Sequence, residues 1–128
     1  MTVGFPPESL TAAVLTLPWP PSVNTYWRHP NSGPLAGRHL ISDKGRKYRE
    51  AVKAMAHSVA PVMGRTAVAI LACPPDRRRR DLDNLNKAIL DSLVNASVIE
   101  DDGLIDMLTI VRGEIVKDGA VYVRIEQL

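Results

Sequence analysis

The stretch Thr66-Ala-Val-Ala-Ile-Leu-Ala-Cys73-Pro-Pro75, together with the segment that follows it, decides the fold class. Residues 66–73 are apolar, which is typical of a strand covered on both faces, and the two prolines end that strand. From residue 82 onward, apolar residues recur at the spacing of one helical stripe, at Leu82, Leu85, Ile89, Leu93 and Ala96. The stretch therefore predicts a buried strand followed by an amphipathic helix that ends at residues 95–97.

A strand and a first helix are predicted before this stretch. Residues 12–17 form a short apolar run with β-branched content, which predicts a strand that a proline ends. Residues 22–40 have no periodicity and predict a loop. The helix is expected to begin at Ser42 or Asp43 and to end before residue 61, with an apolar stripe made of Tyr48, Val52, Met55 and Val59.

Two strands are predicted near the C-terminus. Residues 107–116 are rich in β-branched residues, and residues 120–126 alternate between inward and outward positions. Asp118-Gly119 between them is a tight-turn signal, so the two strands are expected to pair as an antiparallel hairpin. The order strand, helix, strand, helix, strand, strand predicts a single α+β domain over residues 1–128, with a mixed sheet covered by helices.

Composition excludes several classes of protein. The chain has 128 residues, of which 45% are hydrophobic and 23% charged, so it is long enough for one core and is not disordered as a whole. Cys73 is the only cysteine, which excludes an intramolecular disulfide and a cysteine-based zinc site, and the three histidines lack zinc-binding spacing. No apolar run has the roughly 18 residues of a membrane span, and the N-terminus does not resemble a signal peptide. We expect a cytoplasmic protein without a membrane partner, with residues 1–10 as a flexible extension.

Charge is distributed unevenly along the chain. Residues 1–80 hold 12 Lys and Arg against 4 Asp and Glu, a net charge of +8, whereas residues 81–128 hold 4 against 10, a net charge of −6; the two sum to +2. This asymmetry favours a polyanion-binding surface beside an acidic site. The alternative is that both halves interleave in one sheet and their charges average over the surface.

Two groups of carboxylates are candidate metal ligands. Asp81 and Asp83 lie two residues apart where a loop becomes a helix, and Glu100-Asp101-Asp102 follows that helix. Converging carboxylates repel each other unless a divalent cation offsets the repulsion, and their hard oxygen ligands favour Mg²⁺ or Mn²⁺. The alternative for Asp81 and Asp83 is ordinary helix capping. The two groups meet only if the chain folds back along the helix, which the spacing does not establish.

Basic residues flank the first acidic pair. The four consecutive arginines are suited to phosphate oxygens or form a solvated loop: Arg77, Arg78, Arg79 and Arg80. Lys87 lies four residues after Asp83 and four before Asp91, which predicts either an exposed ladder of ion pairs or a lysine that reaches a phosphate. Asp91 is assigned to the ladder, and Asn84 is expected either to orient a carboxylate or to cap the helix.

Two combined motifs resemble the RusA family of Holliday junction resolvases. The first is Asp76-Arg-Arg-Arg-Arg-Asp81-Leu-Asp83-Asn-Leu-x-Lys87 followed by Asp101-Asp102, and the second is Leu17-Pro-Trp-Pro-Pro-Ser22-x-Asn24-x-Tyr26. The resemblance extends from about Leu15 to Ile125, nearly the whole chain, and the combination is more specific than either part. The segment before Thr11 departs from the pattern but holds no motif residue.

The resemblance implies a function and a set of site residues. The family consists of small homodimers, often encoded by phages or prophages, that use Mg²⁺ to cut four-way DNA junctions symmetrically in recombination and repair. By position, Asp81, Asp83 and Asp102 correspond to its metal-binding catalytic carboxylates and Lys87 to its essential lysine, while Asp101 is the less certain member. The arginine run is expected to bind DNA.

Two other functional classes fit parts of the pattern. A non-catalytic DNA-binding module of a phage or prophage would use the same basic surface, but it gives no reason to gather carboxylates near bound phosphate. A phosphatase or nucleotide-sugar transferase with an Asp-x-Asp motif would need a larger α/β domain. Three aromatic residues near the N-terminus either stack on DNA or, as we expect, pack under the loop: Trp19, Tyr26 and Trp27.

Overall fold

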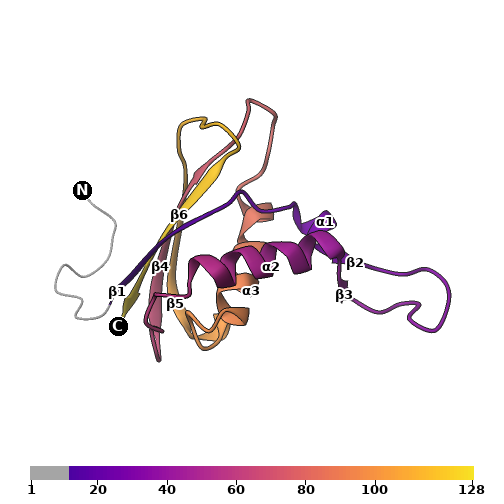
Figure 1. The fold of residues 1–128 in the computed structure, drawn as a ribbon, viewed down its shortest axis with the longest axis horizontal. Helices are drawn as coiled ribbons and strands as arrows, with labels where there is room; N and C mark the ends of the chain where they lie inside the picture. The colour runs from indigo at the N-terminus through magenta and orange to yellow at the C-terminus, as the bar shows by residue number, and fades with distance from the viewer. Residues whose placement is uncertain (1–11) are drawn as a thin grey trace.

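The computed structural model describes residues 12–128, which form a four-stranded sheet with two long helices against one face (Figure 1). The sheet has the order β1-β6-β4-β5 and consists of β1 (Ala12–Leu17), β4 (Thr66–Cys73), β5 (Ile105–Arg112) and β6 (Ala120–Gln127). The helices are α2 (Asp43–Met55) and α3 (Asp83–Asn95). The α+β class and the mixed sheet are confirmed, whereas the expected extension at residues 1–10 lies outside the described residues.

Four short elements lie where sequence patterns predict only loops. They are α1 (Val23–Tyr26), β2 (Trp27–Arg28), β3 (Leu40–Ile41) and the 3₁₀ turn η1 (Asp102–Leu104). Elements of two to four residues are too short to show a hydrophobic period, so the pattern could not predict them. Within the described chain, no helix has both the length and the apolar character that a membrane crossing requires.

The predicted hairpin between the last two strands is wrong. β5 and β6 are not neighbours, because β4 lies between them and pairs with β5 in parallel and with β6 antiparallel. Asp118 and Gly119 do turn the chain, with φ values of 65° and 73°. The whole connection from residue 113 to 119 is nevertheless long enough to step across one intervening strand, a distance of about 10 Å. β4 is apolar throughout and is buried more completely as a central strand than at an edge.

The core lies between the sheet and the helices. The predicted stripe of α3 is confirmed, since Leu85, Ile89 and Leu93 are at most 3% exposed. The stripe predicted for α2 is only partly confirmed. Tyr48 and Val52 are buried, but Met55 is 52% exposed because the buried positions continue to Ala56 instead.

Gly45 allows α2 to approach the chain that leads into it. A Cβ atom at this position would overlap the carbonyl oxygen of Tyr26 and come within 2.7 Å of Ile41 Cγ1. Ser42 caps α2, since its Oγ accepts a hydrogen bond from the N–H of Gly45 (3.0 Å). The first turn of α2 is therefore fixed against α1 and β3, as predicted for a helix that begins after Ser42.

Candidate active site

Asp81 and Asp83 lie where the loop after β4 enters α3. Asp81 directly precedes the helical turn and Asp83 is the first residue of α3, and both side chains are exposed. The N-cap residue is Leu82, and no side chain caps this end of the helix. Neither aspartate is therefore used for capping, and both lie at the end of the helix dipole that favours negative charge.

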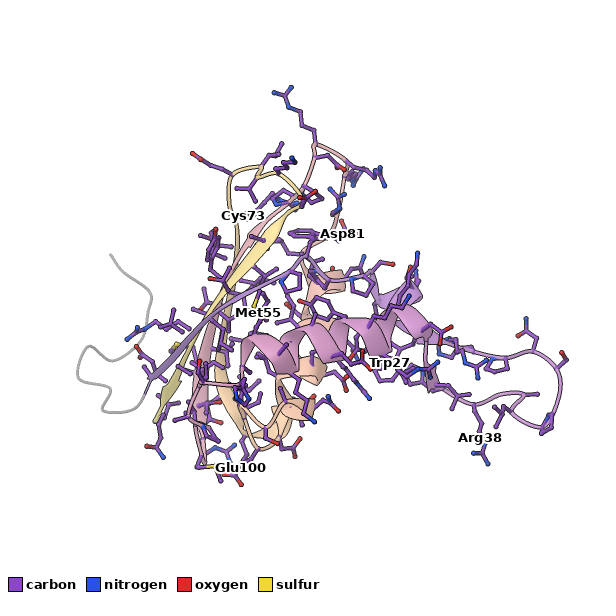
Figure 2. All side chains as sticks on the ribbon, viewed as in Figure 1. Trp27, Arg38, Met55, Cys73, Asp81 and Glu100 are labelled. Carbon is purple, nitrogen blue, oxygen red and sulfur yellow. The ribbon has the colours of Figure 1, made fainter. Side chains whose placement is uncertain are left out.

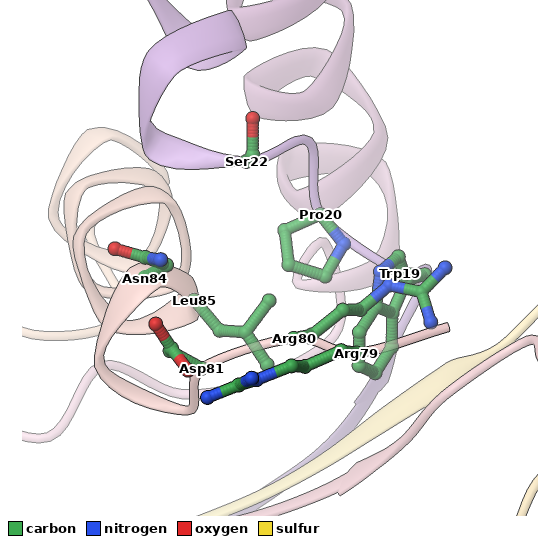
Figure 3. Close-up of a pocket in the computed structure, with 8 residues that line it drawn as sticks. All are labelled: Trp19, Pro20, Ser22, Arg79, Arg80, Asp81, Asn84 and Leu85. Atoms are coloured by element: carbon green, nitrogen blue, oxygen red, sulfur yellow. The ribbon is translucent and has the colours of Figure 1, made fainter. Parts of the chain in front are cut away.

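A cavity of about 350 Å³ opens beside Asp81 (Figure 3). Asp81 and Asn84 lie on the side formed by the start of α3, and Trp19 and Pro20 lie on the opposite side. The remaining lining residues are Ser22, Arg79, Arg80 and Leu85. Most of the lining residues are polar or charged, so the cavity suits a charged ligand or the charged part of a larger one. Asp83 and Lys87 are exposed and are not part of this lining.

The four arginines differ in their surroundings. Arg80 has a side chain only 17% exposed, its Nη1 donates to Asp76 Oδ1 (2.8 Å), and its guanidinium lies 5.5 Å from the ring centroid of Trp19. The hydrogen bond from Arg80, followed by that from the N–H of Arg78, lowers the pKa of the Asp76 carboxyl to about 2. Arg80 thus forms a fixed wall of the cavity.

The other three guanidinium groups are exposed. Arg78 lies 3.9 Å from Asp76 at its closest approach, and within the described chain Arg77 and Arg79 have no carboxylate partner. A loop that fixes one arginine and leaves two without an ion-pair partner keeps cations available to an anion that approaches Asp81.

Asp91 does not continue the predicted ladder with Lys87. Its Oδ2 lies 2.7 Å from Nη2 of Arg49 on α2 and accepts a hydrogen bond from the hydroxyl of Tyr26, which is completely buried. Burial, and then the hydrogen bond to Asp91, raise the pKa of Tyr26, so this hydroxyl remains a donor at neutral pH. Asp91 therefore ties α3 to α1 and α2, which is a structural role. Lys87 is left exposed on the helix.

Asp101 and Asp102, the second acidic pair, lie near the start of β5. The Asp101 carboxylate accepts a hydrogen bond from the N–H of Gly103 (3.3 Å) and so caps η1. Glu100 accepts from the N–H of Gly64 (2.6 Å), which fixes this segment beside the residues that lead into β4. Because β4 and β5 are parallel, the starts of both strands lie at the same end of the sheet.

Asp81 lies at the opposite end of the molecule from Glu100 (Figure 2). Arg112 ends β5, and its Nη2 donates to the carbonyl oxygen of Arg80 (2.8 Å), which holds the loop before Asp81 against that end. A strand of eight residues is roughly 23 Å long. Two oxygens on one Mg²⁺ are about 3 Å apart, given metal–oxygen distances of about 2.1 Å. A single chain therefore does not bring Asp102 to Asp81, and its described part contains no cluster of three or more metal-ligating side chains.

Three residues of this region were not assigned a role from the sequence. Trp19 was expected to pack under the loop rather than to stack on DNA, and the structure also makes it one wall of the cavity, which Ser22 lines as well. Both belong to the proline-rich motif, which was the available signal. Arg112 carried no signal, because its contact with Arg80 depends on β5 running parallel to β4.

Comparison with known proteins identifies the family of this chain. Residues 18–126 match the family model described as Endodeoxyribonuclease RusA. A crossover junction endodeoxyribonuclease of Enterobacteria phage HK97 is 41% identical over 115 residues, which cover 88% of this chain and 92% of the relative. A protein of the same name from Escherichia coli K12 is 36% identical over 117 residues, which cover 89% and 93%. The chain therefore belongs to the RusA family of endodeoxyribonucleases.

Proposed function

We propose that this protein is a Mg²⁺-dependent endonuclease that resolves four-way DNA junctions in recombination and repair, with Mn²⁺ as a substitute metal. One observation carries the proposal: two exposed carboxylates that do not cap their helix lie directly after a loop of exposed arginines. A surface that only binds DNA would be weakened by such carboxylates. The relatives named above supply the substrate, since their names specify crossover junctions.

The site residues divide into three roles. Asp81, Asp83 and Asp102 would hold the divalent ion, which when bound supplies an activated water and neutralises charge at the leaving oxygen. Lys87, exposed one turn after Asp83, would stabilise charge on the scissile phosphate. The exposed arginines of the run 77–80 would hold the flanking backbone, while Arg80 shapes the cavity.

The separation of the carboxylates calls for two copies of the chain. Asp81 lies at the end of β5 and Asp102 at its start, so one chain offers only part of the ligand set at each end. A two-fold axis perpendicular to the strands reverses these ends and places Asp102 of one copy at the same end of the assembly as Asp81 of the other. A junction with approximate two-fold symmetry needs two equal cuts, and a homodimer of this kind has two equal sites.

The sheet offers a surface for such a dimer. The face opposite the helices has exposed apolar side chains at Val14, Leu71, Val111 and Tyr122, with exposed fractions of 66%, 41%, 51% and 42%. Leu71 lies opposite both Val111 and Tyr122 in the sheet, so these side chains form one patch. Contiguous apolar patches on a surface mark interaction sites, and a second copy would cover this one.

Complementation between two inactive variants tests the proposal. Asp81→Asn and Asp102→Asn are prepared separately and then mixed after mild dissociation, and cleavage of a synthetic four-way junction is followed with and without Mg²⁺. Each variant alone should be inactive. In a shared site, a mixed dimer has one intact set of carboxylates, so the mixture should regain Mg²⁺-dependent nicking, whereas sites within one chain would give none.

A variant of the apolar patch provides a second test of the shared site. Val111→Asp combined with Tyr122→Asp should give a folded monomer by light scattering and circular dichroism, and this monomer should not cut. A monomer that cuts at the wild-type rate would disprove the shared site. A wild-type protein that binds junctions in Mg²⁺ without cutting them would instead support the DNA-binding module.

A further inference from the structure

Residues 27–41 form a projecting arm that the proposed active site does not use. β2 and β3 pair at its root, and residues 29–39 extend from them away from the sheet and the long helices (Figure 1). The arm begins five residues after Ser22, which lines the cavity beside Asp81. Any long ligand bound at Asp81 therefore lies near the root of the arm.

A series of ring contacts, edge-to-face for the first pair and tilted for the other two, supports the root of the arm. The rings of Tyr26 and Trp27 have centroids 5.0 Å apart, those of Trp27 and His39 are 4.3 Å apart, and those of His39 and His29 are 4.6 Å apart. His29 Nε2 and His39 Nδ1 form a hydrogen bond of 2.5 Å. Because Tyr26 is completely buried, these ring contacts connect the arm to the core.

Backbone hydrogen bonds shape the outer part of the arm. The N–H of Gly37 donates to the carbonyl oxygen of Pro30 (2.9 Å), and the N–H of Arg38 donates to that of Leu35 (3.1 Å). Gly33 and Gly37 have φ values of 82° and 79°, which glycine adopts without strain. An arm that is already ordered loses little conformational entropy when it binds.

The arm carries only positive charge. There is no Asp or Glu between residues 12 and 42. Arg28 and Arg38 are exposed, and neither has an ion-pair partner among the described residues. Figure 2 shows the side chain of Arg38 pointing into solvent. Unpaired guanidinium groups on a rigid support are suited to phosphate oxygens.

We infer that this arm binds the phosphate backbone of the duplex that flanks the cut, through Arg28 and Arg38. The inference rests on the proposed function, because the junction substrate supplies the duplex. A loop of eleven residues that returns to its root reaches at most about 18 Å, half of its extended length. With phosphates spaced at about 3.4 Å along a strand, the arm reaches roughly five base pairs beyond the site.

The test measures junction affinity without divalent metal as a function of salt and of the length of the DNA arms. In one junction the duplex that flanks the cut is long, and in the other this duplex is trimmed to about three base pairs, inside the reach of the protein arm, and closed by a hairpin loop. The double variant Arg28→Ala/Arg38→Ala is compared with wild type and with Lys53→Ala. Lys53→Ala removes one positive charge in the last turn of α2, at the end of that helix farthest from the arm, and serves as the control for loss of charge away from the arm.

The double variant should make the fall of log K with log salt shallower, reducing the magnitude of the slope by about 1.8, the value for two lost phosphate contacts. It should also abolish the advantage of the long-armed junction, on the order of tenfold. Lys53→Ala should leave the ratio of the two affinities unchanged. An unchanged ratio and slope in the double variant would overturn the inference and leave the nuclease intact. Wild type that binds the junctions but does not cut them in Mg²⁺ would overturn only the nuclease proposal.

Discussion

Each end of α3 has a group of carboxylates beside it, and the two groups lie in contrasting surroundings. Asp81 and Asp83 lie at the N-terminal end, where the helix dipole favours negative charge and arginines precede them. At the other end, Asp101 caps η1 and Glu100 accepts a backbone hydrogen bond. Within residues 12–128, the carboxylate of Asp102 has no hydrogen-bond partner. The first end therefore suits the cation and phosphate of the proposed function, while the second offers one available carboxylate.

The largest effect is expected at the first end. Asp81→Asn should reduce junction cleavage in Mg²⁺ by at least about a thousandfold, because it removes a charged metal ligand while keeping the shape of the side chain. Affinity for the junction without metal should stay equal or increase, since one repulsive charge is lost. Single-turnover cleavage and equilibrium binding measure the two effects separately. Near-normal cleavage by this variant would remove Asp81 from the site.

The second end is tested by two adjacent substitutions. Asp102→Asn should reduce cleavage by roughly the same factor as Asp81→Asn, whereas Asp101→Asn should change it less than about threefold, because asparagine also caps turns. The paired variants differ by one position and lose the same charge, so each is the control for the other. Equal losses of activity would show that the contrast between a capping and an available carboxylate is wrong.

Sequence patterns predicted the first end well because its signals are local. The stripe of α3, the proline break after β4 and the position of Asp81 and Asp83 all depend on residues close together in the chain. The distance between the two acidic groups is not local. It depends on β5 pairing in parallel with β4, and the turn at Asp118-Gly119 instead suggested a hairpin with β6.

Asp91 illustrates the same limit on a smaller scale. Its spacing of four residues from Lys87 predicts an ion pair within one helix, and the sequence holds no signal for Arg49, which is 42 residues away. Partners across two packed helices follow from how α2 and α3 meet, and a single helical period does not contain that information.

Lys87 separates charge stabilisation from metal binding at the first end. Lys87→Ala should reduce single-turnover cleavage by about a hundredfold, the effect of removing one group that stabilises the transition state. Its side chain is exposed, so the free energy of unfolding and the junction affinity should change little. Lys87→Arg is the matched control, because it keeps the charge and should recover part of the rate. An unchanged rate in Lys87→Ala would exclude the lysine from the site.

The smallest expected effect concerns the hydrogen bonds to Asp91, which lies within α3 between its two ends. Tyr26→Phe removes the hydroxyl that donates to Asp91 but keeps the buried ring, so it should lower the free energy of unfolding by about 1 kcal/mol. Arg49 remains 2.8 Å from Asp91 through its Nε and limits the loss. Urea unfolding measures the change, and junction cleavage per folded molecule should stay within about twofold, since neither group reaches the cavity beside Asp81. A loss of cleavage as large as that of Lys87→Ala, without a matching loss of stability, would show that the network between α1, α2 and α3 positions the catalytic end directly.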